Sequence, residues 1–160
     1  MRFVMAFALV IFLNGCSIAT GKKFSGLETP HPDTARIYIL RTEGGKSFNQ
    51  QNAVGDFPDI SVNNKIIGPL KRGGYLTANT SPGLTKIFTE KSINWQLGRA
   101  REEIFSLSTQ AGHAYFIQLD FSRGFGYTYS NLPARKIFVN VREITEAEAV
   151  PLLRELVFSE

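Results

Sequence analysis

Short apolar stretches separated by turn residues recur from residue 35 to residue 144, and this pattern most constrains the fold. β-branched and aromatic residues dominate the stretches, while Gly, Pro or Asn occupy the breaks. Many short strands at a spacing of roughly 8–12 residues favour an antiparallel sandwich or barrel. The predicted fold class is therefore mainly β, an antiparallel β-sandwich. The expected strands cover residues 36–41, 60–62, 65–68, 75–78, 84–90, 103–107, 114–121 and 136–144.

Two details of this pattern predict local structure. The pair Asn63-Asn64 indicates a tight hairpin, because Asn tolerates the positive φ that a type I′ turn requires. In the strand at residues 84–90, we expect the apolar side chains to pack in the core. These side chains are Leu84, Ile87 and Phe88.

The C-terminus predicts one short helix. Thr145 and Glu148 have the spacing of a capping box, in which each side chain accepts a hydrogen bond from the other residue's backbone N–H. Pro151 removes a backbone bond, so the helix either kinks there or begins there. Leucines follow at helical spacing, at Leu152, Leu153 and Leu156.

A chain of 160 residues has room for one domain. Its 43% apolar content is too high for a disordered chain and too low for a protein with several membrane helices. The net charge is +4, and no run of Lys and Arg exceeds two residues, whereas nucleic-acid binders gather basic residues on one face. We therefore expect one self-sufficient domain that binds no nucleic acid.

The only cysteine, Cys16, follows an uninterrupted apolar run at residues 3–13, which itself follows Arg2. As a helix this run would rise about 16 Å, too little for a ~30 Å hydrocarbon core but suited to the apolar part of a signal peptide. A lone cysteine cannot form an internal disulfide, so in an exported chain its position needs a reason. We expect residues 1–15 to be a cleaved signal peptide.

The residues before Cys16 resemble the lipobox of bacterial lipoproteins. Leu13 stands three residues before the cysteine and the small Gly15 directly before it, while Asn14 replaces the more usual Ala or Ser. The resemblance implies cleavage before Cys16 and a diacylglyceryl group, with two acyl chains, on its sulfur. It also implies a third acyl chain on the nitrogen of Cys16. Two acyl chains already give stable anchoring. Ser17, in place of Asp, favours an outer-membrane location facing the periplasm. The alternative is a plain secretory signal with a coincidental cysteine.

After the signal peptide we expect a lipidated N-terminus and tether at residues 16–32 and the folded domain at residues 33–160. Pro30 and Pro32 favour extended backbone, so the tether is interpreted as a flexible linker that spans roughly 20–25 Å. The last part of this tether can instead pack on the domain.

The extended stretches at residues 32–41 and 60–70, with the Gly-Gly-Tyr of residues 73–75 and the Pro-Gly of residues 82–83, resemble the bacterial DUF2846 family. Its members are largely small exported or lipid-anchored proteins of unknown function. The stretches are also similar to PEGA-type modules, in which Gly stands at the position of Asn64. The resemblance implies a β-sandwich of immunoglobulin, prealbumin or PEGA type at the cell envelope, and it carries over no catalytic residue.

Glycine-spaced aromatic residues form the one candidate ligand site. A flat ring can cover a sugar face, and Gly allows close backbone approach. Trp95, Phe125, Tyr127 and Tyr129 would then bind carbohydrate or peptidoglycan. The simpler interpretation places the last three on one face of a core strand.

No catalytic or metal-ligating constellation is found in the sequence. His31 and His113 are the only histidines, and no cysteine beyond Cys16 can join them. We expect no cofactor other than the covalent lipid on Cys16, and no enzymatic activity. The expected function is that of a non-catalytic structural or protein-interaction module with an envelope protein as partner. A carbohydrate- or peptidoglycan-binding module is the alternative, and an envelope enzyme ranks behind both.

Overall fold

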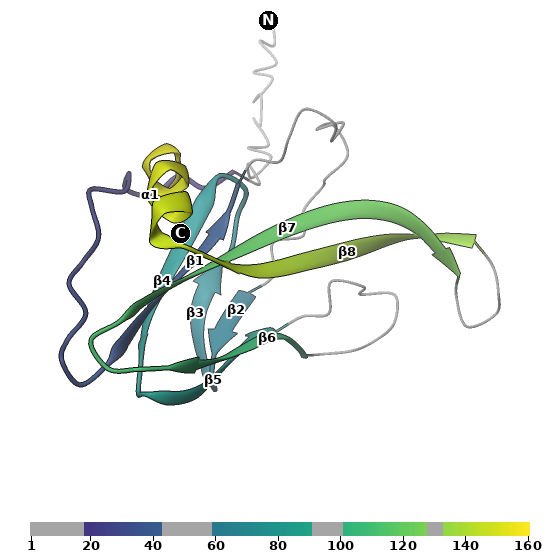
Figure 1. The fold of residues 1–160 in the computed structure, drawn as a ribbon. Helices are drawn as coiled ribbons and strands as arrows, with labels where there is room; N and C mark the ends of the chain where they lie inside the picture. The colour runs from purple at the N-terminus through teal and green to yellow at the C-terminus, as the bar shows by residue number, and fades with distance from the viewer. Residues whose placement is uncertain (1–17, 43–58, 91–100, 128–132) are drawn as a thin grey trace, which may run out of the picture.

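The computed structural model describes residues 18–42, 59–90, 101–127 and 133–160, with the backbone alone at residues 121–127 and 133–138 (Figure 1). The expected signal peptide, residues 1–15, lies outside the described residues. The elements are β1 (Ala35–Arg41), β2 (Asp59–Val62), β3 (Lys65–Pro69), β4 (Gly74–Thr80), β5 (Gly83–Thr89), β6 (Glu102–Thr109), β7 (Ala114–Tyr127), β8 (Pro133–Ile144), α1 (Glu146–Glu155) and β9 (Val157–Phe158).

Two sheets build the domain. One has the strand order β8-β7-β1-β4-β9 and the other β3-β2-β5-β6. The mainly β class, the two sheets and the single C-terminal helix are confirmed, but the first sheet is mixed instead of purely antiparallel. β1 pairs in parallel with β7, and β4 in parallel with β9. A parallel pair needs a long connection between its two strands. Here β2 to β6 connect β1 with β7, and β5 to β8 together with α1 connect β4 with β9.

Apolar side chains of both sheets meet in a first core. In β1, Ile37 and Ile39 point into this core, while Tyr38 and Leu40 point to the opposite face of the sheet. Burial on both faces explains why β1 has a nearly continuous apolar sequence. The buried members of the first core are Ile37, Ile39, Ile60, Val62, Leu70, Leu76, Ala78, Ile87, Ile117 and Leu119.

A second core lies on the other face of the five-stranded sheet, under α1. Leu153 is completely buried there and Leu156 nearly so, which confirms the predicted apolar face of the helix. The molecule therefore has three layers, with the five-stranded sheet in the middle. The buried members of this second core are Tyr38, Leu40, Tyr75, Phe116, Ile144, Ala149, Leu153 and Leu156.

The orientation of β5 corrects one prediction. Ile87 is buried as expected, but Leu84 is 64% exposed and Phe88 only half-buried. The inward positions beside Ile87 are instead Thr85 and Thr89. The hydroxyl of Thr85 lies 3.1 Å from that of Thr109 and 3.4 Å from that of Thr80, so it is satisfied without water. Thr85 can therefore point into the core although it is polar, and its neighbour Leu84 then points to the solvent, contrary to what hydrophobicity alone predicts.

The predicted hairpin between β2 and β3 is confirmed, with Asn63 at a φ of 52°. The Asn63 side chain also joins this turn to two other strands, a role that the sequence did not indicate. Its Oδ1 accepts from the Lys86 N–H (2.9 Å), and its Nδ2 donates to the Thr80 hydroxyl (3.0 Å).

The capping box places the start of α1 at Glu146. Thr145 is the N-cap, and both reciprocal hydrogen bonds with Glu148 are present. These bonds to Thr145 stabilise the carboxylate and lower the pKa of Glu148. Pro151 lies inside the helix, so of the two predicted arrangements the one that begins at Pro151 is wrong.

Candidate functional site

Most of the candidate site residues cannot be placed. Cys16, Trp95 and Tyr129 lie outside the described residues. Phe125 and Tyr127 belong to the outer part of β7, where the backbone pairs with β8 well beyond the point at which β1 ends its pairing (Figure 1). Their side chains are outside the described part, so an aromatic ligand face stays a prediction.

The N-terminal segment, residues 18–28, is built into the fold. It runs along β9 and therefore extends the five-stranded sheet beyond its last strand. The interpretation of residues 16–32 as a flexible linker is thus wrong for this segment, because its backbone groups are paired with the domain. Its backbone hydrogen bonds run from Ala19 N–H to the Arg72 carbonyl (2.9 Å), from Gly21 N–H to the Phe158 carbonyl (3.0 Å), from Phe158 N–H to the Lys22 carbonyl (2.7 Å) and from Phe24 N–H to the Leu156 carbonyl (3.4 Å).

Side chains of the same segment complete the second core. Phe24 and Leu27 pack against this core. Ala19 is 6% exposed and lies against Gly74 at the start of β4. The ring of Phe24 packs edge-on against Tyr75 and Tyr38, with centroid distances of 5.7 and 6.4 Å. Such edge-to-face pairs each contribute about 0.5–1.5 kcal/mol beyond the buried area. The segment therefore belongs energetically to the domain.

Glu28 fixes the far end of the N-terminal segment. Its backbone N–H donates to the Tyr38 hydroxyl (2.9 Å), and its carboxylate forms an ion pair with Arg36. Arg36 also donates to Asn79 (3.0 Å) and to the hydroxyl of Thr77 (3.1 Å). These contacts join the segment to β1 and β4.

Two glycines allow this close approach. A Cβ at Gly21 would lie 2.3 Å from the Phe158 carbonyl oxygen, and a Cβ at Gly74 would lie 2.8 Å from the Cβ of Ala19. Because the neighbour of Gly21 is backbone, it cannot move aside without breaking the ladder between the N-terminal segment and β9. The sequence pattern did not single out these positions as contacts between the termini.

Ser159 connects the C-terminus to the turn before β4. It is 2% exposed, its hydroxyl donates to the Pro69 carbonyl (2.6 Å), and the same oxygen accepts from the Lys71 N–H (2.8 Å). The N-terminal segment, the residues of and after β9 and the turn at residues 69–74 therefore form one hydrogen-bonded junction, called here the terminal junction.

Arg41 lies beside this junction, at the end of β1. It is 8% exposed, and its Nη1 donates to the Leu70 carbonyl (2.9 Å). Burial, with a smaller contribution from the positive charge of Arg72, lowers the pKa of Arg41 to about 10. Arg41 and Arg72 therefore lie close enough at this junction for their charges to interact.

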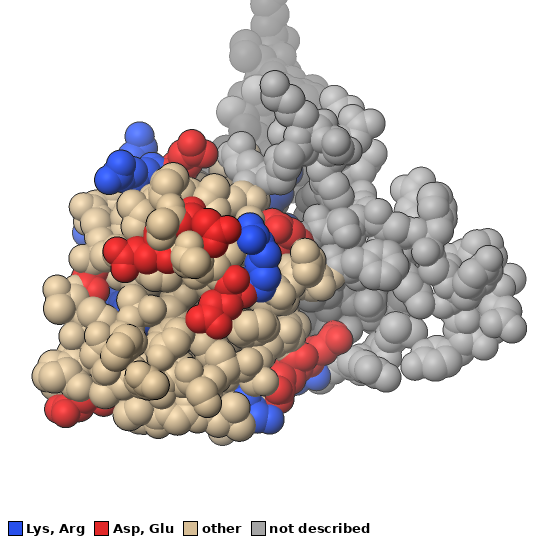
Figure 2. Space-filling view, viewed as in Figure 1, with Lys and Arg blue, Asp and Glu red and all other residues tan. Residues whose placement is uncertain are grey.

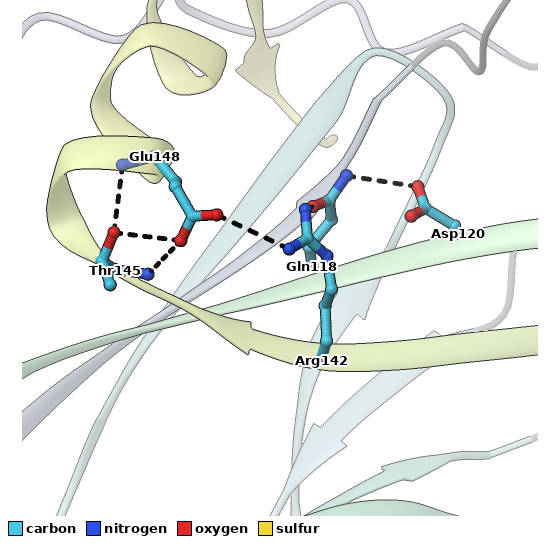
Figure 3. A network of polar contacts seen from close by, with 5 residues as sticks. All are labelled: Gln118, Asp120, Arg142, Thr145 and Glu148. Atoms are coloured by element: carbon cyan, nitrogen blue, oxygen red, sulfur yellow. Dashed lines mark hydrogen bonds and ion pairs between the residues drawn. The ribbon is translucent and has the colours of Figure 1, made fainter.

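A separate polar network holds α1 to the sheet (Figure 3). Arg142 on β8 donates to the Gln118 side chain (2.7 Å) and forms an ion pair with Glu148 (3.6 Å). Gln118 in turn donates to Asp120 (3.3 Å). The network joins β7, β8 and the first turn of α1, and it adds a polar contact to the apolar packing of the helix in the second core.

The two histidines lie at the opposite end of β1 from the terminal junction. The His31 Nδ1 is 3.7 Å from the Asp33 carboxylate, and the His113 Nδ1 is 2.9 Å from the Ala111 carbonyl. Within the described residues, no three His, Cys, Asp or Glu side chains come together in a way that could hold a metal ion. None of the helices in the same part of the chain is long and apolar enough to span a bilayer.

A family model matches most of the domain. The model of DUF2846, a family described as protein of unknown function, matches residues 31–144. No curated protein and no solved structure matches the chain. The matched residues contain β1 to β8, whereas the N-terminal segment, α1 and β9 lie outside them. Because the match covers more than half of its length, the chain belongs to the DUF2846 family.

Proposed function

We propose that this protein is a lipid-anchored, non-catalytic module of the bacterial cell envelope, which acts in structure or protein interaction at the outer membrane and faces the periplasm. The lipobox-like residues that end at Cys16 support the anchor. Membership of DUF2846 adds no enzymatic role to this proposal.

The observation that carries the proposal is the position of the N-terminal segment. Only Ser17 separates Cys16 from Ile18, which pairs with the domain beside Arg72. A cysteine so close to an ordered sheet edge would pass any pull on the lipid directly to the fold. The hydrogen bonds of Ala19 and Gly21 provide that mechanical connection.

The outward face of the four-stranded sheet supports an interaction role. Ile66 on β3 is 58% exposed and Leu84 on β5 is 64% exposed. A partner that covered both side chains would bury apolar surface that is now exposed to water. Both are near the ends of their strands farthest from the terminal junction, where a partner can reach them away from the membrane.

Replacing Cys16 with Ser tests the anchor. The Cys16→Ser variant should take up no palmitate analogue and should leave the membrane pellet, because serine offers no sulfur for the diacylglyceryl group. Ser17→Ala, which keeps the cysteine, should label and pellet as the parent protein does. Labelling together with sedimentation of Cys16→Ser would contradict the proposal.

A further inference from the structure

We infer that the domain lies directly on the bilayer in one fixed orientation, with lysines of the N-terminal segment on anionic phospholipid headgroups. This inference rests on the proposed lipidation of Cys16. The end of the sheet that touches the membrane, called here the proximal end, contains Ile18, Gly74 and Val157, which are neighbours through the Ile18–Arg72 bridge and the pairing of β4 with β9.

Chain length fixes the distance of the proximal end from the lipid. Two peptide steps lead from Cys16 to Ile18, and an extended chain advances at most ~3.6 Å per residue, or about 7 Å in all. The lipidated sulfur lies at the level of the headgroups. The proximal end must therefore stay at the membrane surface, because the paired backbone of Ala19 and Gly21 leaves no slack beyond Ile18.

The surface held in this position is basic. Lys22 and Lys23 are exposed, and Ile18 is 44% exposed next to them. The segment that holds these lysines, residues 17–27, contains no acidic residue. Positive charge of this kind is attracted to anionic lipid.

Other charged groups at this end belong to the C-terminal residues and to the second sheet. Arg154, Glu155 and Glu160 come from the C-terminal residues. Asp59 pairs with Pro69 beside the junction, and Glu90, whose N–H donates to the Asp59 carbonyl, forms an ion pair with Arg101. Figure 2 shows acidic and basic side chains interspersed over the visible face. The most acidic turn of α1, which contains Glu146 and Glu148, is the one farther from β9.

The opposite, distal end of the domain must then point away from the membrane. β1 and β4 pair from Arg41 with Gly74 at the proximal end to Ala35 with Thr80 at the distal end, a length of roughly 20 Å at ~3.3 Å per residue. The turn that contains Asn63 contacts Thr80 and is therefore also distal. Lys65, next to this turn, provides an exposed lysine far from the membrane.

Fluorescent probes on the lipidated protein test this orientation. Because Cys16 is acylated, a single cysteine introduced at exposed Thr20 (Thr20→Cys) or at exposed Ser81 (Ser81→Cys) is the only free thiol for labelling. The protein is placed in phosphatidylcholine vesicles, with and without phosphatidylglycerol, that carry a nitroxide quencher on the headgroups. We expect the probe at position 20 to be strongly quenched and the probe at position 81 to be hardly quenched.

Lysine variants test the contribution of charge. Each basic group near an anionic surface strengthens binding about fivefold. The double variant Lys22→Gln with Lys23→Gln should therefore lower the ratio of domains in contact with the headgroups to domains out of contact about 25-fold. Quenching at position 20 in phosphatidylglycerol vesicles should fall accordingly, while the matched Lys65→Gln leaves it unchanged. Equal quenching at positions 20 and 81 would overturn the fixed orientation, and no response to phosphatidylglycerol would overturn the headgroup contact.

The mass of the N-terminal peptide, measured before reconstitution, separates the two proposals. An acylated Cys16 with equal quenching at both positions rejects the orientation and leaves the anchor standing. A peptide without acyl chains rejects the anchor, and the orientation with it.

Discussion

Gly21→Ala is expected to destabilise the domain by about 1–3 kcal/mol, the usual cost of forcing a methyl group into a packed site. The new Cβ would lie 2.3 Å from the Phe158 carbonyl oxygen and 3.0 Å from its carbonyl carbon. The clash is with backbone atoms, so relief requires the N-terminal segment to separate from β9. Chemical denaturation of the parent and variant proteins measures the loss.

The neighbouring substitution Thr20→Ala is the control for Gly21→Ala. Thr20 is exposed, and an exposed surface substitution changes the free energy of unfolding by less than about 0.5 kcal/mol. If Gly21→Ala were as stable as Thr20→Ala, the close contact between the N-terminal segment and β9 would not exist in solution.

Leu153→Ala is expected to lower the free energy of unfolding by about 2–5 kcal/mol, the range for a fully buried leucine whose removal leaves a cavity. Leu153 is completely buried between α1 and the five-stranded sheet, in the same core that Phe24 joins from the N-terminal segment. Equilibrium unfolding in urea gives the difference.

Leu84→Ala makes the same chemical change at a side chain that is 64% exposed, so its cost should be less than about 1 kcal/mol. Because both variants replace a leucine with alanine, the difference between their losses of stability reports the effect of burial alone. Equal losses in the two variants would contradict the orientation of β5 or the packing of α1.

Local sequence signals predicted much of the fold because local physics decides those elements. The capping box at Thr145 and Glu148 satisfies N–H groups within four residues, and the alternation in a strand depends on its own side chains. The parallel pairing of β1 with β7 could not be obtained in this way. This pairing joins strands that are separated in the chain by β2 to β6, and no short stretch of sequence contains information on both strands.

Leu84 shows where hydrophobicity misleads. The inward positions of β5 belong to Thr85 and Thr89 as well as Ile87. The Thr85 hydroxyl is satisfied by hydroxyls on β4 and β6, and these partners are 5 and 24 residues away in the sequence. From the sequence alone the hydrogen-bond partners of a threonine are unknown, so a buried threonine cannot be told from one at the surface.

The N-terminal segment was missed for a related reason. Its main contacts are backbone hydrogen bonds to Arg72 and Phe158, and backbone groups leave no pattern in the residue types. The available signals were Gly21 and Phe24, a small and an aromatic residue in a stretch without periodicity. The two prolines at positions 30 and 32 favoured a linker, yet extended backbone is also what a sheet edge requires.

Amide hydrogen exchange at the N-terminal segment tests the central claim most directly, namely that the chain is paired with the domain from Ile18 onward, two residues after the proposed anchor Cys16. The amides of Ala19 and Gly21 donate to Arg72 and Phe158, and the amide of Phe158 donates back to Lys22. We expect all three amides to exchange slowly and at similar rates, because one opening of this ladder exposes them together. Exchange of Ala19 and Gly21 at the rate of a free coil, with Phe158 still protected, would contradict the account.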